Sequence, residues 1–119
     1  MKRDLDLLRD ILLRIEDAES DLENQAFYDL SDNPRTIGFH IRLLIDAGFI
    51  SAIDISSKGA LDYFIIQRLT FAGCEYLDSV RSTTIWEQAK QKLSSIGGSA
   101  SLDVITSLCA DLAKAQLGI

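Results

Sequence analysis

The fold is decided by the stretch His40-Ile41-Arg42-Leu43-Leu44-Ile45-Asp46-Ala47-Gly48-Phe49-Ile50. Its apolar residues recur three and four positions apart up to Ala47, as on the buried face of a helix. Upstream, Asp32-Asn33-Pro34 supplies a capping side chain and then proline at the first helical position. Gly48 supplies the left-handed stop that commonly ends a helix. The sequence therefore predicts a helix from residue 34 to about 47, followed directly by a strand.

The segment after this helix predicts a β-hairpin. Residues 49–55 alternate apolar with polar side chains, and residues 63–69 are rich in aromatic and β-branched ones. Between them, the cluster Ser56-Ser57-Lys58-Gly59 has the composition of a turn. Thr70 then caps a helix that we expect to continue to about Arg81.

The segment before the helix at 34–47 predicts one further helix and a connector. Leucine and isoleucine repeat at helical spacing over residues 3–18. The connector from 19 to 32 is short, and we expect it to hold either a strand, at residues 26–30, or one turn of helix.

Two more helices are predicted at the C-terminal end. Thr84 and Glu87 have the spacing of a capping box and open a helix that carries Trp86, Ala89, Leu93 and Ile96 on one face. Gly97-Gly98 ends it, and Ser101 caps the last helix. The prediction is an α+β fold, mainly α, in a single domain 1–119, with a core at 1–81 and a helical extension at 82–119.

Composition places the chain among globular proteins and excludes a generally basic nucleic-acid coat. It has 119 residues, 12 basic and 18 acidic, and a net charge of −6. All of this excess lies in residues 1–32, whereas residues 33–70 carry a net charge of +1. Residues 33–70 are therefore the stretch that a polyanion is least repelled by.

Two motifs resemble winged-helix regulators of the multiple-antibiotic-resistance and arsenic-repressor types. His40 to Ile50 looks like the end of their recognition helix, and Gln67-Arg68-Leu69-Thr70-Phe71-Ala72-Gly73 looks like the segment after their wing. The resemblance implies a winged-helix-like domain with a β-hairpin wing and dimerisation through terminal helices.

The whole chain resembles an uncharacterised family of small bacterial and prophage proteins, a domain of unknown function. The residues that carry this resemblance are Met1 to Arg9, His40 to Ile50, Leu69-Thr70, Leu77-Asp78 and Thr84-Ile85-Trp86.

Two functions follow as alternatives. A DNA-binding transcription regulator of bacterial or prophage type would contact duplex DNA through basic and hydroxyl side chains, namely Arg35, Thr36, Arg42, Lys58 and Arg68. A protein-interaction or dimerisation module without DNA binding would use apolar side chains instead, namely Phe39 and Leu43. A homodimer is expected through Trp86, Leu93, Ile105 and Leu112.

The sequence offers little material for catalysis. His40 is the only histidine, and we expect it to be structural and half-buried. Cys74 and Cys109 stand apart among apolar neighbours, as reduced core cysteines do. We therefore expect no enzyme activity, catalytic residue, cofactor or metal. Without a signal peptide or a membrane span, we expect a cytoplasmic protein.

Overall fold

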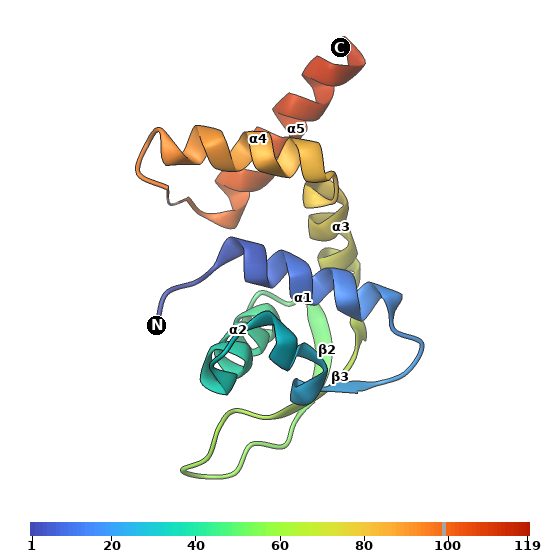
Figure 1. Ribbon diagram of the computed structural model, residues 1–119. Helices are drawn as coiled ribbons and strands as arrows, with labels where there is room; N and C mark the ends of the chain where they lie inside the picture. Colours follow the sequence, from blue (N-terminus) through green and yellow to red (C-terminus); the bar gives the residue numbers. More distant parts are fainter. Residues whose placement is uncertain (99) are drawn as a thin grey trace. The chain divides into compact units, whose positions relative to one another are not determined.

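The computed structural model describes residues 1–98 and 100–119 and confirms an α+β, mainly helical fold (Figure 1). The elements are α1 (Leu5–Asp17), β1 (Leu22–Glu23), the 3-10 helix η1 (Asn24–Leu30), α2 (Pro34–Asp46), β2 (Ile50–Asp54), β3 (Phe64–Leu69), α3 (Phe71–Val80), α4 (Thr83–Ser94) and α5 (Leu102–Leu117). The chain divides into two compact units, Met1–Cys74 and Glu75–Ile119. The single domain with a core at 1–81 stays a prediction.

A small antiparallel sheet organises the unit Met1–Cys74. Its strand order is β1-β3-β2, so β3 is central although it comes last along the chain. In the register, Leu22 lies opposite Ile66, and Ile50 lies opposite Leu69. The hairpin that was predicted from residues 49–69 is therefore present as β2 and β3.

The core of this unit lies between its helices and one face of the sheet. Helix α1 packs against β3 and α2, and α2 packs against η1 and β2 (Figure 1). The buried apolar side chains include Leu8, Ile11, Leu12, Phe27, Ile37, Ile41, Leu44, Phe64 and Ile66. Burying one such side chain contributes roughly 1.5–3 kcal/mol, so the apolar stripes that predicted the helices also stabilise their packing.

The connector between α1 and α2 differs from its prediction. A strand was expected at 26–30, but this segment belongs to η1, and the two-residue strand β1 precedes it. The connector has room for both elements because β1 has only two residues and the seven residues of η1 follow it directly. The aromatic and apolar residues that suggested a strand lie in η1, and from there the Phe27 side chain is buried.

The two ends of α2 are built as the sequence predicts. The Asn33 side chain accepts a hydrogen bond from the backbone N–H of Arg35, and Pro34 opens the helix. At the other end Gly48 adopts a φ of 76°, the left-handed conformation that favours glycine. The backbone N–H of Phe49 then donates to the carbonyl of Leu44.

The segment after β3 is fixed against this end of α2. The backbone N–H of Thr70 donates to the carbonyl of Phe49, and its hydroxyl donates to the carbonyl of Gly48. The same hydroxyl oxygen accepts from the N–H of Gly73, so Thr70 caps α3 as expected. A Cβ on Gly73 would lie 2.0 Å from the Phe49 carbonyl oxygen. The two motifs of the winged-helix resemblance therefore meet in space.

His40 is fully buried, not half-buried as predicted. Its Nε2 accepts a hydrogen bond of 2.8 Å from the backbone N–H of Asp4, and its Nδ1 lies 2.8 Å from the Thr36 carbonyl oxygen. This geometry assigns the proton to Nδ1, which then donates to Thr36. Asp4 also caps α1 by accepting from the N–H of Leu7. The histidine thus joins α2 to the start of α1.

The unit Glu75–Ile119 contains α4 and α5, which pack against each other. Helix α4 begins two residues earlier than the predicted capping box, because its cap is Ser82, whose hydroxyl oxygen accepts from the N–H of Ile85. Ile96 lies beyond the end of α4 and is exposed, contrary to its predicted place on the apolar face. The cap at Ser101 is confirmed by its hydrogen bond from the N–H of Val104.

We predict that Gly73→Ala destabilises the protein by about 3 kcal/mol, because the added methyl group collides with the Phe49 backbone. The thermal midpoint should fall by about 10 °C, as measured by circular dichroism. The exposed neighbour Ala72 provides the control, since Ala72→Ser should change stability by less than about 0.5 kcal/mol. Equal midpoints for Gly73→Ala and the unsubstituted protein would contradict the close approach.

Candidate functional site

Four of the predicted DNA contacts lie on three parts of the unit Met1–Cys74. Arg35 and Thr36 belong to the first turn of α2, Lys58 belongs to the connection between β2 and β3 (residues 55–63), and Arg68 belongs to β3. Arg35, Lys58 and Arg68 are exposed, whereas Thr36 is half-buried. Arg68 donates a hydrogen bond of 3.0 Å to the Leu69 carbonyl. Three of the predicted cations are therefore exposed.

Arg42, the remaining predicted contact, is occupied within the chain. Its guanidinium forms ion pairs of 3.0 Å with Asp54 and 3.2 Å with Asp62. It also lies over the ring of Phe64, 4.8 Å from the ring centre. The three charged side chains are all partly exposed, so each ion pair contributes little by itself. Together they join α2 to both ends of the β2–β3 connection.

The backbone of Asp62 comes unusually close to α2. A Cβ on Gly38 would lie 2.8 Å from the Asp62 carbonyl oxygen. The same oxygen accepts a hydrogen bond of 2.8 Å from the fully buried amide of Asn24, and the amide oxygen accepts from the N–H of Phe64 at 3.0 Å. Asn24 therefore fixes the place where the connection enters β3.

Sequence reasoning missed the partners of this contact. The signal that was available is Gly38, because an isolated glycine inside a helical pattern costs stability and usually has a packing or functional reason. No local pattern identifies Asn24 as the residue opposite, because its two hydrogen bonds reach positions 38 and 40 residues away.

The other end of the connection is held by a turn at Asp54. The Asp54 carboxylate accepts from the N–H of Ser56, and the Ser56 hydroxyl oxygen accepts from the N–H of Tyr63, both at 2.9 Å. Hydrogen bonds from the Ser56 hydroxyl and N–H, and then from Arg42, lower the pKa of Asp54 from 3.8 to about 2. The hydrogen bond to Asp62, and then that to Asp54, raises the pKa of Arg42.

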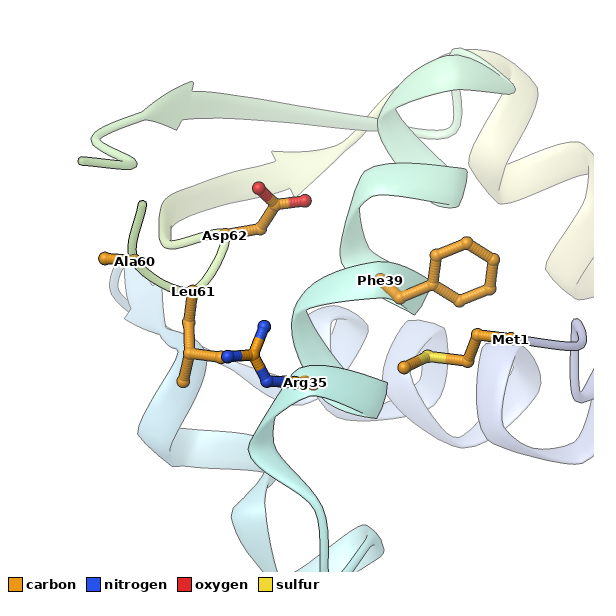
Figure 2. A pocket seen from close by; sticks show the side chains of 6 residues that line it. All are labelled: Met1, Arg35, Phe39, Ala60, Leu61 and Asp62. Carbon is orange, nitrogen blue, oxygen red and sulfur yellow. The ribbon is translucent and has the colours of Figure 1, made fainter. Parts of the chain in front are cut away.

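A hollow of about 200 Å³ opens between α2 and the β2–β3 connection. Its lining residues are Met1, Arg35, Phe39, Ala60, Leu61 and Asp62. Figure 2 shows Arg35 and Phe39 projecting from α2, with Leu61 and Asp62 coming from the connection. The structure thus brings one predicted DNA contact and one predicted interface residue to the same hollow.

The predicted interface residues divide into two groups. Phe39 and Leu43 on α2 and Leu112 on α5 are half-buried and keep some exposed surface. Trp86, Leu93 and Ile105 are buried within the chain, and their assignment to an interface stays a prediction. Their helical spacing fits a core as well as an interface, and the pairing of α4 with α5 supplies the core.

The cysteines also differ from their prediction. Both are free, but Cys74 is exposed and only Cys109 is buried. Within residues 1–98 and 100–119, no three histidine, cysteine, aspartate or glutamate side chains gather as metal ligands would. None of the helices in that described part is both long and apolar enough to cross a bilayer.

We predict that Ser56→Ala and Arg42→Gln each raise the pKa of Asp54, because the hydrogen bonds of both side chains lower it. The folded pKa of about 2 lies below the ordinary 3.8, so the carboxylate stabilises the fold fully above about pH 4. That contribution is lost as the pH falls from about 4 to about 2. A carbon-13 NMR titration of Asp54 measures both pKa changes.

The exposed neighbour Ser57 gives the control for this titration, since Ser57→Ala should leave the pKa of Asp54 unchanged. An Asp54 carboxylate that titrates at 3.8 in the unsubstituted protein would contradict the turn geometry.

Comparisons with known proteins place the chain in a family. The family described as "Hypothetical protein (DUF2513)" matches residues 2–100. An "Uncharacterized protein" of Haemophilus influenzae is 37% identical over 107 residues, which cover 88% of this chain and 89% of that protein. No solved structure matches the chain. On the extent of the family match and of this relative, the chain belongs to the DUF2513 family.

Proposed function

We propose that the unit Met1–Cys74 is a winged-helix module that binds duplex DNA. The observation that carries this proposal is the chain path α1, β1, η1, α2, β2, β3, with β3 between the other two strands. The sequence predicts either a strand or a helical turn in the connector. The structure has both β1 and η1 there, so a helical element precedes α2. Such an element is what a helix-turn-helix requires before its recognition helix.

In this proposal α2 enters the major groove and the β2–β3 connection acts as the wing. Arg35 and Thr36 stand at the start of α2, where a recognition helix contacts base edges and phosphates. Lys58 on the connection and Arg68 on β3 would contact the DNA backbone in this proposal.

Arg42 has a different role in this proposal. Two carboxylates already occupy its guanidinium, so it orients the wing against α2 and does not contact phosphate. Three basic side chains remain for phosphates, and the plot of log affinity against log salt should therefore have a slope of about −3. Binding to random duplex is then weak at physiological salt, and useful affinity requires two modules on a paired site.

We predict that the double variant Arg35→Ala/Lys58→Ala binds pooled genomic duplex fragments at least about tenfold more weakly at 50 mM salt, since two phosphate contacts are lost. Fluorescence anisotropy measures the affinity and its salt dependence. Both side chains are exposed, so the thermal midpoint should stay unchanged.

The matched control is Lys92→Ala/Lys114→Ala, which removes the same charge from exposed positions on α4 and α5. If both double variants lose affinity equally, the binding is a general effect of net charge and the assignment of α2 and the wing is wrong. If the unsubstituted protein retains no fragment at low salt, the DNA-binding proposal itself is wrong.

A second candidate function is a protein-interaction or dimerisation module with the same fold. The observation that favours it is the chemistry of α2, where Phe39 and Leu43 keep exposed apolar surface while Arg42 is neutralised. Apolar and aromatic side chains of this kind are typical of protein interfaces and unusual on a surface that reads bases.

We predict a homodimer in solution, with twice the chain mass of 13.2 kDa by light scattering at tens of micromolar. If α2 forms the interface, Phe39→Ser/Leu43→Ser gives a monomer, because polar replacements remove its apolar contact. If α5 forms it, Leu112→Ser does so instead. A 13.2 kDa particle for the unsubstituted protein excludes the homodimer.

A further inference from the structure

The hollow between α2 and the β2–β3 connection combines one cation with apolar walls (Figure 2). Phe39, Leu61 and Met1 supply the apolar side chains, and Arg35 supplies the cation. The Phe39 ring is held in place by an edge-to-face contact with the buried His40, at 5.3 Å between ring centres. One wall of the hollow is therefore preorganised.

The charges around the hollow leave Arg35 available. Within the described residues, Arg42 engages both carboxylate oxygens of Asp62, at 3.2 Å and 3.3 Å. In Figure 2 the Asp62 carboxylate points away from the Arg35 guanidinium. Asp54, the second partner of Arg42, does not line the hollow. No ion pair in the described part of the chain involves the Arg35 guanidinium, so its donors face the hollow unpaired.

The size of the hollow limits what it accepts. Its volume is about 200 Å³. It is smaller than the pockets of about 300–1,000 Å³ that take drug-sized ligands. A guest with one charged group and a short apolar chain fills it.

We propose that this hollow binds a carboxylate carried on a short apolar body. The planar guanidinium of Arg35 donates two N–H groups to the carboxylate, the geometry in which arginine recognises such anions. The apolar body lies against Phe39 and Leu61. Asp62 also lines the hollow and shares Arg42 with Asp54, so the single cation suits a monoanion at most. The apolar walls disfavour a strongly hydrated dianion such as phosphate.

Titrations with three probes of equal length test this site. Hexanoate should bind at least about tenfold more tightly than hexanamide, because hydrogen bonds to a charged group are stronger than neutral ones, and hexylamine should not bind. Methyl NMR signals of Met1 and Leu61 report the binding directly. Arg35→Gln should reduce the affinity for hexanoate to that for hexanamide, whereas Arg68→Gln should leave it unchanged.

Two results would overturn the proposal: equal affinity for hexanoate and hexanamide, or full hexanoate affinity in Arg35→Gln. Circular dichroism verifies that this variant folds. N-acetylleucine separates the two sources of such a carboxylate. Tighter binding than hexanoate identifies the C-terminal residue of a protein, and equal or weaker binding identifies a free short-chain acid.

One consequence rests on the proposed DNA binding. Since Arg35 cannot hold a carboxylate and a phosphate together, hexanoate should weaken the binding of duplex fragments, and hexanamide should not. The direct titration requires no DNA. The two titrations therefore distinguish a ligand site without DNA binding from DNA binding without a ligand site.

Discussion

The structure of the unit Met1–Cys74 depends on one close contact, where the backbone of Asp62 meets α2. The contact requires that Gly38 has no side chain, because a Cβ there would lie 2.8 Å from the Asp62 carbonyl oxygen. It also requires Asn24, whose buried amide satisfies that oxygen and the N–H of Phe64. A buried polar group left without a partner costs about 1–3 kcal/mol. The place where the β2–β3 connection joins β3 is therefore fixed by a side chain from η1.

This contact decides which cations face solvent. Once Asp62 lies beside α2, its carboxylate reaches Arg42, and Asp54 reaches it from the other end of the connection. Arg42 then serves the packing of the connection, whereas Arg35, two turns earlier on the helix, takes part in none of these ion pairs. The proposed recognition of DNA and the proposed carboxylate site both use Arg35. The chemistry of the surface thus follows from a backbone approach that involves neither arginine.

Sequence reasoning found most of the elements but only part of the candidate site. Helix α2, the strands of the hairpin and the cap at Ser101 were predicted close to their observed bounds. Arg35, Lys58 and Arg68 are exposed, and their role as DNA contacts stays a prediction. The hollow beside Phe39 was not predicted, because its walls come from segments more than twenty residues apart.

By itself the sequence determined the local features: where α2 starts at Asn33 and stops at Gly48, and which stripe of each helix is apolar. These features arise from hydrogen bonds and spacings within a few residues. Tertiary structure alone decided that Trp86 is core, that Cys74 is exposed and that Arg42 is neutralised. Each of these depends on which distant segment packs alongside, and a charge or an apolar stripe does not specify its partner.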